Sequence, residues 1–418
     1  WGGKPEAAVL WSDLRVPAAQ AAWVNGSMCH ARDYDDTHDR AILHAGVSVV
    51  PAAFAAAEIA GRPVSGRELY AGVAAGLELI CRAGCATGKS LIDTGFLYTS
   101  LFGYFAATVA ACRVLGMSAE DTHNALGIVL SQAAGSHQVT RDAAWTKRMG
   151  PGFAARGALT AVAMARKGIR GARQVFDGVD GVGNIYLQGS FDSQKAREGL
   201  GRRYDFVDLS YKPYPCCRFN HTAIDAALAL RGQPGFDWRK VSAVTAYVNS
   251  AANQAVGTPL AVRQAPATVV QAQFSICYTI AAALVNDTVG IADFATEAFT
   301  RADVMRLAAR VTPVVDDAIE REWGRNVGPT RVELVMDGRT VSVQVDEAKG
   351  SLGNPMSEGD LMRKLEDCLA FGGFDPASAG HFRHVIDRLA ESRDVAADYR
   401  ALIDRIRADA ARARRTEA

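Results

Sequence analysis

The sequence predicts a mainly α-helical protein that carries an inserted, smaller α+β domain. Two observations lead to this fold class. Apolar residues recur at helical spacing, with many alanines and glycines between them, from Ala18 to about Arg173 and again from Ser357 onward. Between these blocks the chain is rich in β-branched residues, and Asp337-Gly338 separates two alternating runs of apolar and polar residues.

The length of 418 residues exceeds that of one typical domain, so we expect two. The changes of character near Tyr211 and Ser357 set their boundaries. We expect a discontinuous all-helical domain, with an α+β lid inserted into it. The predicted ranges are 1–208 for the first part of the helical domain, 209–350 for the α+β lid domain, and 351–418 for the return to the helical domain.

Start and stop signals predict five helices in the first block. Pro51 is suited to the first turn of one helix, Ser65 and Ser118 are N-caps of two others, and the break Gly150-Pro151-Gly152 precedes the last. The many small residues indicate helices whose axes approach closely. The predicted helices are Ala52–Ala60, Arg67–Ala83, Leu101–Leu115, Ala119–Ala133 and Ala154–Arg166.

The middle block combines strands and helices. Asp337-Gly338 is a two-residue hairpin turn between two runs of alternating residues, the strongest short-range hairpin signal that a sequence offers. Helical spacing resumes after Ser357, with helices at Glu358–Ala370, Ala377–Leu389 and from Val395 onward. In the middle block we predict strands at Val241–Val248, Arg331–Met336 and Arg339–Val345, and helices at Thr222–Arg231 and Val270–Val285.

Charge and hydropathy exclude two classes of partner. Forty-six Lys and Arg residues against forty-five Asp and Glu residues give a net charge of +1, which provides no basic surface for nucleic acid or for an anionic membrane. No run reaches the roughly 20 apolar residues of a membrane span. The eight cysteines are scattered without regular spacing, as reduced thiols are, so we expect a cytoplasmic protein. The chain begins at Trp1 rather than Met, so we expect either that residues precede it in a longer protein or that it was processed.

The densest group of polar residues runs from Asn25 to Asp39 and is followed by His44. So many carboxylates and imidazoles beside alanine-rich helices require either solvent or a site, and a polar surface loop is as good an interpretation as a functional one. A calcium loop beginning at Asp33 is excluded, because His38 stands at its sixth position, where glycine is required, and His44 at its twelfth, where glutamate is required.

Three further segments hold candidate residues. Lys147 and Arg148 stand at a helix start, where two cations near backbone amides could hold a carboxylate, although such a lysine is usually solvated. The proline-stiffened loop from Tyr211 to His221 carries Arg218, and a loop at a domain junction is a common place for ligand contacts. Tyr278 lies on an apolar helix, where a core tyrosine is the simpler interpretation.

Motifs for metals, nucleotides and dinucleotides are missing from the sequence. Gly178-Val-Asp-Gly-Val-Gly183 departs from the dinucleotide fingerprint, and the phosphate-loop-like segment Gly84–Ser90 is one residue short. We therefore predict no metal and no cofactor.

Taken together, the motifs resemble the MmgE/PrpD family, which includes 2-methylcitrate dehydratase, cis-aconitate decarboxylase and iminodisuccinate epimerase. The matching stretches follow the family order along nearly the whole chain. The resemblance implies a helical domain built from both chain ends, an inserted α+β lid, a cleft between them, a homodimer and no metal. The stretches are Asn25–His30, Asp33–Thr37, His44, Pro51–Ala60, Thr146-Lys147, Lys212–Arg218 with His221, and Ala272–Ser275 with Tyr278.

The resemblance also implies roles for single residues. It places Asp33, Thr37, His44, Lys147 and Tyr278 in the active site, and His221 and Cys217 on the lid segment that faces it. One position departs from the pattern, since relatives usually read Gly-Phe-His-Pro-Thr where this chain has Gly95-Phe96-Leu97-Tyr98-Thr99.

These residue types suggest a mechanism. We expect Lys147, together with Arg218, to neutralise a substrate carboxylate, while His44 moves a proton at the adjacent carbon. Asp33 would orient His44 or Thr37, and Tyr278 would donate a proton to a leaving hydroxide or to the opposite face. Thr37, Arg218, His221 and Cys217 would bind the substrate.

The predicted activity is a metal-free reaction at the carbon α to a carboxylate of a di- or tricarboxylic acid. A 2-methylcitrate dehydratase-like lyase ranks first, an epimerase of an iminodisuccinate-like dicarboxylate second and a cis-aconitate-type decarboxylase third. A hypothesis from another class is a carboxylate-binding protein without catalytic activity, in which Leu97 has replaced an active-site histidine.

Overall fold

A computed structural model describes residues 2–324 and 326–416 of the chain, with side chains described up to residue 408. Trp1, on which the expectation of a longer protein rests, lies outside the described residues. The chain forms two compact units. The helical unit comprises Trp1–Ala31, Ala41–Leu209 and Gly372–Ala418, and the α+β unit comprises Arg32–Arg40 and Ser210–Phe371.

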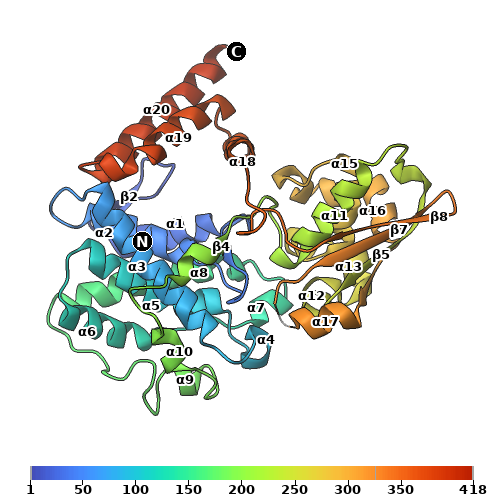
Figure 1. The fold of residues 1–418 in the computed structure, drawn as a ribbon. Helices are drawn as coiled ribbons and strands as arrows, with labels where there is room; N and C mark the ends of the chain where they lie inside the picture. Colours follow the sequence, from blue (N-terminus) through green and yellow to red (C-terminus); the bar gives the residue numbers. More distant parts are fainter. Residues whose placement is uncertain (1, 325, 417–418) are drawn as a thin grey trace. The chain divides into compact units, whose positions relative to one another are not determined.

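The helical unit contains one small antiparallel strand pair and a bundle of helices (Figure 1). Its strands are β1 (Ala7–Ala8) and β2 (Arg15–Val16). Its helices before the α+β unit are α1 (Ala18–Cys29), α2 (Gly46–Glu58), α3 (Gly66–Cys85), α4 (Leu91–Thr94), α5 (Tyr98–Val114), α6 (Ala119–Leu130), α7 (Gln138–Arg141), α8 (Thr146–Ala165), α9 (Val182–Ile185), α10 (Ser193–Arg197) and the 3₁₀ turn η1 (Asp205–Asp208). After it come η7 (Pro376–Ser378), α19 (Ala379–Asp387), η8 (Leu389–Glu391) and α20 (Val395–Thr416).

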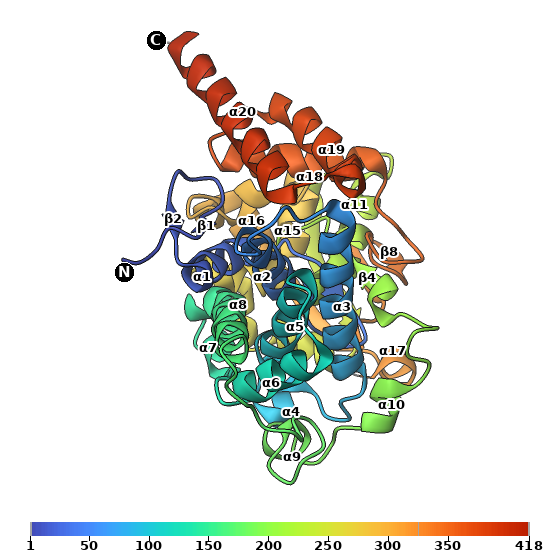
Figure 2. The same ribbon diagram turned by 90° about the vertical axis from the view of Figure 1, so that its left-hand side faces the viewer.

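Helix α5 is the centre of this bundle and packs against α2, α3, α6 and α8 (Figure 2). Small residues allow the close approach that the sequence predicts. A Cβ atom at Gly76 of α3 would stand 2.8 Å from the carbonyl oxygen of Ala106 on α5, so only glycine fits there. The predicted caps are also confirmed: the Ser65 side chain accepts from Glu68 N–H in a capping box, and the Ser118 side chain accepts from Asp121 N–H.

Two predicted helix starts are wrong in the same way. Helix α8 begins at Thr146 and continues through Gly150-Pro151-Gly152, where we expected a break, and α2 begins at Gly46 with Pro51 inside it. A proline near the start of a helix forfeits one backbone hydrogen bond, and that loss is offset where neighbouring helices pack closely. Gly152 provides such packing, since a Cβ there would lie 2.3 Å from Ser27 Oγ on α1.

The α+β unit is built around a four-stranded mixed sheet in the order β6-β5-β7-β8. The four strands of this sheet are β5 (Val241–Val248), β6 (Val311–Val315), β7 (Thr330–Met336) and β8 (Arg339–Val345). The unit also contains β3 (Thr37–His38), and β4 (Leu209–Ser210) lies at the boundary of the unit. Its helices are η2 (Arg218–Asn220), α11 (His221–Arg231), η3 (Trp238–Lys240), α12 (Ser250–Ala252), the π-helix η4 (Asn253–Gly257), α13 (Leu260–Gln264), α14 (Val269–Gln273), α15 (Ile276–Asn286), η5 (Ile291–Phe294), η6 (Ala298–Thr300), α16 (Ala302–Ala308), α17 (Asp317–Trp323) and α18 (Glu358–Phe371).

The predicted hairpin is confirmed. Strands β7 and β8 pair antiparallel from Thr330–Val345 to Met336–Arg339, and both turn residues have positive φ, 51° at Asp337 and 75° at Gly338. Helix α11 packs against β7 and β8, while β5 pairs in parallel with β6 (Figure 1). The single helix expected at Val270–Val285 is two, because α14 ends at Gln273 and Ser275 caps the start of α15.

The unit boundaries differ from the expected domain boundaries at two places. Segment 32–40 groups with the α+β unit, and so does α18, which we expected in the returning helical part. Contacts within the unit explain both assignments. The Lys349 ammonium lies 2.8 Å from Asp360 Oδ1 on α18, and Lys364 of the same helix donates to the carbonyl oxygen of Tyr34 at 2.7 Å.

Among the described residues, no helix combines the length and the apolar character that a bilayer span requires.

Candidate active site

Close packing of α1 on α8 brings two predicted segments together in the helical unit. The helices run in opposite directions: Trp23 stacks on Phe153 at a ring distance of 5.8 Å, and a Cβ at Gly26 would stand 2.9 Å from Gly152 Cα. The end of α1 therefore meets the start of α8. His30, the C-cap of α1, and Lys147, in the first turn of α8, occupy these two ends.

The Lys147 ammonium bonds to the His30 imidazole. Lys147 Nζ lies 3.2 Å from His30 Nε2, and both side chains are buried, with 6% and 2% of their surfaces exposed. An ammonium group has only donors, so His30 Nε2 is the acceptor and the proton of a neutral His30 ring is on Nδ1. Unlike a lysine–carboxylate pair, this pair keeps a net positive charge.

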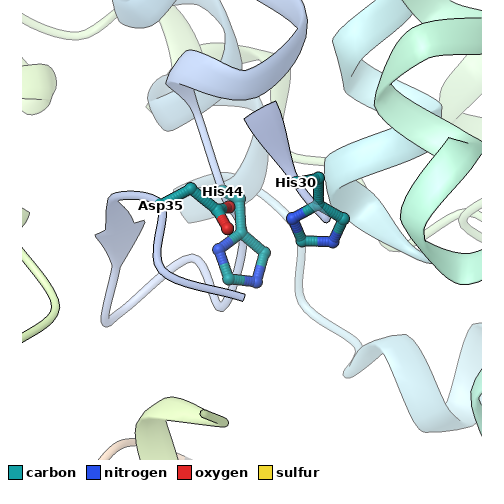
Figure 3. Close-up of side chains that lie close together, drawn as sticks. All are labelled: His30, Asp35 and His44. Atoms are coloured by element: carbon teal, nitrogen blue, oxygen red, sulfur yellow. The ribbon is translucent and has the colours of Figure 1, made fainter. Parts of the chain in front are cut away.

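A second imidazole lies beside the first. The rings of His30 and His44 are 4.8 Å apart between centroids and tilted by 58° (Figure 3). The backbone N–H of His44 donates to Thr99 Oγ1 at 2.9 Å, which fixes the chain at His44 to the first turn of α5. The third residue labelled in Figure 3, Asp35, belongs to the α+β unit.

The charge of this group suits an anion better than a metal ion. Lys147 and the buried Arg148 stand at the N-terminal end of a twenty-residue helix, where the helix dipole adds positive potential. Imidazole is a common metal ligand, but the bond from Lys147 occupies the Nε2 lone pair of His30, and an ammonium repels a metal cation. The arrangement therefore favours a carboxylate ligand, with imidazoles near enough to move a proton.

In the α+β unit, Asp33 is paired with a lysine. Lys212 Nζ lies 3.6 Å from Asp33 Oδ1 and donates to the Asp33 carbonyl oxygen at 3.0 Å, and both side chains are fully buried. Asp33 has a φ of 56°, uncommon for a residue with a side chain. Lys364 donates to the Lys212 carbonyl oxygen at 2.9 Å, and burial lowers the pKa of Lys364 to about 8. The orienting role of Asp33 toward His44 stays a prediction.

Thr37 and Arg218 belong to a second buried network of the same unit. Thr37 Oγ1 donates to Asp39 Oδ1 at 3.0 Å, so its proton is directed to Asp39 rather than to Asp33. Arg218 binds both oxygens of Asp39, with Nη2 at 3.0 Å from Oδ2 and Nε at 3.1 Å from Oδ1. This bidentate pair already supplies Arg218 with a carboxylate.

His221 uses both ring nitrogens within this network. Nδ1 lies 3.3 Å from Arg218 Nη1, and Nε2 lies 3.4 Å from the Cys216 carbonyl oxygen. Burial and then the charge of Arg218 hold the pKa of His221 well below its usual range, so the ring is neutral, with its proton on Nε2. Cys217 is half-buried, and its backbone N–H donates to the Gln273 carbonyl oxygen at 2.9 Å.

Tyr278 lies in the core of the α+β unit, on α15. Its hydroxyl donates to the Asp293 carbonyl oxygen, and burial followed by the charge of Asp293 raises its pKa. A raised pKa keeps the phenol protonated. The role of Tyr278 as an acid toward substrate stays a prediction.

Within each unit, the predicted site residues thus bond to different partners. His44 and Lys147 come together in the helical unit, through His30. Asp33 pairs with Lys212, Thr37 joins Arg218 and His221, and Tyr278 and Cys217 bond to backbone atoms. His30 and Lys212 are missing from the predicted site, although both lie in segments that the sequence marks as unusual. Only the contact of two helix ends distinguishes His30 from its polar neighbours.

Comparison with known proteins agrees with the motifs. A model of the MmgE/PrpD N-terminal domain matches residues 1–194, and one of the MmgE/PrpD C-terminal domain matches residues 214–391. A cis-aconitate decarboxylase-like protein of Aspergillus oryzae, oryM, is 28% identical over 404 residues, which cover 93% of this chain and 83% of that protein.

Cis-aconitate decarboxylases themselves are also similar. The enzyme of Aspergillus terreus is 26% identical over 375 residues, 85% of this chain and 75% of the enzyme. The human enzyme is 26% identical over 357 residues, 84% of this chain and 73% of the enzyme. The two family models cover most of the sequence, which confirms the resemblance drawn from the motifs: the chain belongs to the MmgE/PrpD family.

Proposed function

We propose that this protein is a lyase that acts at the carbon next to a carboxylate of a tricarboxylic acid. One observation carries the proposal: a buried ammonium, Lys147, bonds to the imidazole of His30, and the imidazole of His44 lies against that ring. The group combines a fixed positive charge with two proton-transfer groups. Both are required when electron density develops beside a carboxylate.

Decarboxylation of a cis-aconitate-like acid is the first candidate reaction, because the similar proteins include cis-aconitate decarboxylases from a fungus and from human. In this reaction the bond to one carboxylate breaks and carbon dioxide leaves. The electron pair spreads onto the conjugated double bond and the neighbouring carboxylate. Lys147 would stabilise that negative charge, and His44 would deliver a proton to the carbon.

Dehydration of a 2-methylcitrate-like hydroxy acid is the second candidate, and the paired imidazoles favour it. One ring can take the proton from the carbon next to the carboxylate, while the other protonates the leaving hydroxyl, and the electron pair of the C–H bond forms the new double bond. His44 would be the base, since His30 Nε2 already accepts a bond from Lys147.

A screen in D₂O read by proton NMR tests the proposal. The wild-type protein is incubated with cis-aconitate, 2-methylcitrate, citrate and iminodisuccinate. We expect one of the two tricarboxylate reactions. Decarboxylation should place one deuterium on the carbon that is protonated, whereas dehydration should give the alkene, with deuterium entering the substrate carbon only when proton removal reverses. His44→Ala should lower the rate about a hundredfold or more, the usual contribution of a proton-transfer group.

Three outcomes would contradict the proposal in different ways. Turnover of iminodisuccinate alone would indicate an epimerase. Binding of tricarboxylates without turnover or deuterium exchange would indicate a carboxylate-binding protein. Unchanged turnover in His44→Ala would show that the proton moves through another group. The homodimer and the cytoplasmic location stay predictions that light scattering and cell fractionation can test.

A further inference from the structure

Besides His30 and His44, the helical unit contains His137. This residue lies where the backbone segments 95–97 and 135–137 form a short antiparallel pair. The backbone N–H of Leu97 donates to the Gly135 carbonyl oxygen at 2.7 Å, and that of His137 donates to the Gly95 carbonyl oxygen at 2.8 Å. Phe96 stands opposite Ser136 between these two bonds. These two bonds hold the backbone of His137 beside the segment that carries Leu97.

Phe96 and Ser136 share one face, and the Phe96 ring packs edge-on against Tyr186 at 5.1 Å. Leu97 and His137 each follow one of these two residues, and the backbone at His137 already turns into α7, with φ −69° and ψ −13°. The residue directly opposite Leu97 is Gly135, which has no side chain. A Cβ there would lie 2.7 Å from Ser100 Cβ, so the glycine is required by the packing of this pair on α5.

The first turn of α5 connects this pair with His44 and Lys147. Thr99 holds the backbone of His44 at 2.9 Å, and the neighbouring Ser100 contacts Gly135. Ser100 also meets the start of α8: a Cβ at Gly150, three residues after Lys147, would stand 2.2 Å from Ser100 Oγ. The segments that carry His44, His137 and Lys147 therefore converge on one helical turn.

The imidazole of His137 is neutral and has one nitrogen in an accessible position. Burial, followed by the charges of Arg141 and Lys147, lowers the pKa of His137 to about 4. The side chain is half-buried, and its Nδ1 is buried with no hydrogen-bond partner among the described residues. The accessible nitrogen is therefore Nε2. If the proton of the neutral ring is on Nε2, that nitrogen can donate to a ligand. The buried Nδ1 then carries only an unbonded lone pair.

We propose that His137 contacts the substrate and determines which tricarboxylate is accepted, by donating a hydrogen bond from Nε2 to one of its carboxylate oxygens. The proposal rests on the proposed lyase function and names a residue outside the motifs that carry the family resemblance. It also concerns Leu97, because the segment that carries Leu97 is paired through its backbone with the segment that carries His137.

The test compares His137→Leu with His137→Gln, assayed on the substrate found by the screen. Leucine removes the donor, whereas the glutamine amide nitrogen reaches close to the position of Nε2. A hydrogen bond to a charged group typically contributes enough for about a tenfold to hundredfold change, so His137→Leu should raise KM by that factor, with a smaller change in kcat. His137→Gln should keep KM within about threefold of the wild-type value. His384→Leu, at an exposed position of α19, is the matched control.

The outcomes separate the two proposals. If the wild type turns over a tricarboxylate and His137→Leu keeps the wild-type KM while it remains folded by circular dichroism, the role of His137 is disproved and the lyase function stands. A KM raised equally in the leucine and glutamine variants would also overturn it, because the donor would not matter. If the wild type turns over no tricarboxylate, the lyase function fails, and the role of His137 fails with it.

Discussion

Both units of the molecule hold a buried cation beside a buried histidine, but they use the pair differently. In the α+β unit, Arg218 binds both oxygens of Asp39, and His221 bonds through both ring nitrogens. In the helical unit, Lys147 bonds to a neutral ring, His30, and the pair retains a positive charge.

The difference shows that residue type and burial do not by themselves distinguish a catalytic cation from a structural one. The two cations differ in whether the group bonded to each one carries the opposite charge. Arg218–Asp39 is electrically neutral and geometrically complete, as expected of a group that holds a loop in place. Lys147–His30 joins a cation to a neutral ring, so this bond does not itself neutralise the charge of Lys147. Four experiments test whether the two cations differ in this way.

Asp39→Ala should have the largest effect, on stability. The Arg218 side chain, 6% exposed, would remain buried after losing its carboxylate, which typically lowers the free energy of unfolding by about 3–5 kcal/mol. Urea denaturation followed by circular dichroism measures the change. Asp287→Ala is the control, because Asp287 pairs with Arg231 while 73% of its side chain is exposed, and such pairs contribute about 1 kcal/mol or less. Equal losses in the two variants would mean that the network of Arg218 is not structural.

Lys147→Met should lower activity strongly and stability only slightly. Removal of a preorganised positive group typically costs about a hundredfold to a thousandfold in kcat, whereas a methionine of similar length fills the space. We expect kcat/KM to fall by that factor and the free energy of unfolding to change by about 1 kcal/mol or less. Lys167→Met, at an exposed position after the same helix, should change neither quantity. A variant that is unstable but fully active would reverse the assignment of the two cations.

Acid should destabilise the protein through its buried neutral histidines. The pKa of His221 lies below its unfolded value of about 6.5, so between these pKa values the unfolded chain binds more protons than the folded one. Stability is therefore retained above pH ~6.5 and falls as the pH drops below it, by at most about 1.4 kcal/mol per pH unit for one group. Urea midpoints at pH 7.5 and 5.5 measure this, and His221→Gln should reduce the difference. An identical difference in the variant would show that His221 is not the titrating group.

Tyr278→Phe should have the smallest effect. It removes the hydroxyl that donates to the Asp293 carbonyl oxygen, a bond whose net contribution is about 1 kcal/mol. If the phenol is structural, as this bond suggests, turnover should stay within about threefold of the wild type. A loss of about a hundredfold at unchanged stability would instead support the predicted role of Tyr278 as a proton donor.

Local signals in the sequence predict much of the fold. The caps at Ser65 and Ser118 and the turn at Asp337-Gly338 are confirmed, because each depends on a few adjacent residues. The break expected at Pro151 is wrong, because tertiary packing of α1 on α8 outweighs a local helix-breaking signal.

The candidate site is predictable in part for the same reason. His44 and Lys147 can be named from the sequence, because motifs surround them. The bond that joins His30 to Lys147 lies between residues 117 positions apart, which no local pattern indicates. The engagement of Arg218 with Asp39, 179 positions away, is equally invisible to a local reading, so a buried structural arginine resembles a ligand-binding one.

The glycines where α1 crosses α8 have a consequence for how such a protein can diverge. Gly26 and Gly152 touch without side chains, and the spacing of the two helices there sets the reach of Lys147 to His30. A lineage can exchange the residues that recognise a substrate one at a time, but a methyl group at either glycine would move both helix ends together. We therefore expect both glycines to be retained while the residues that determine substrate specificity change.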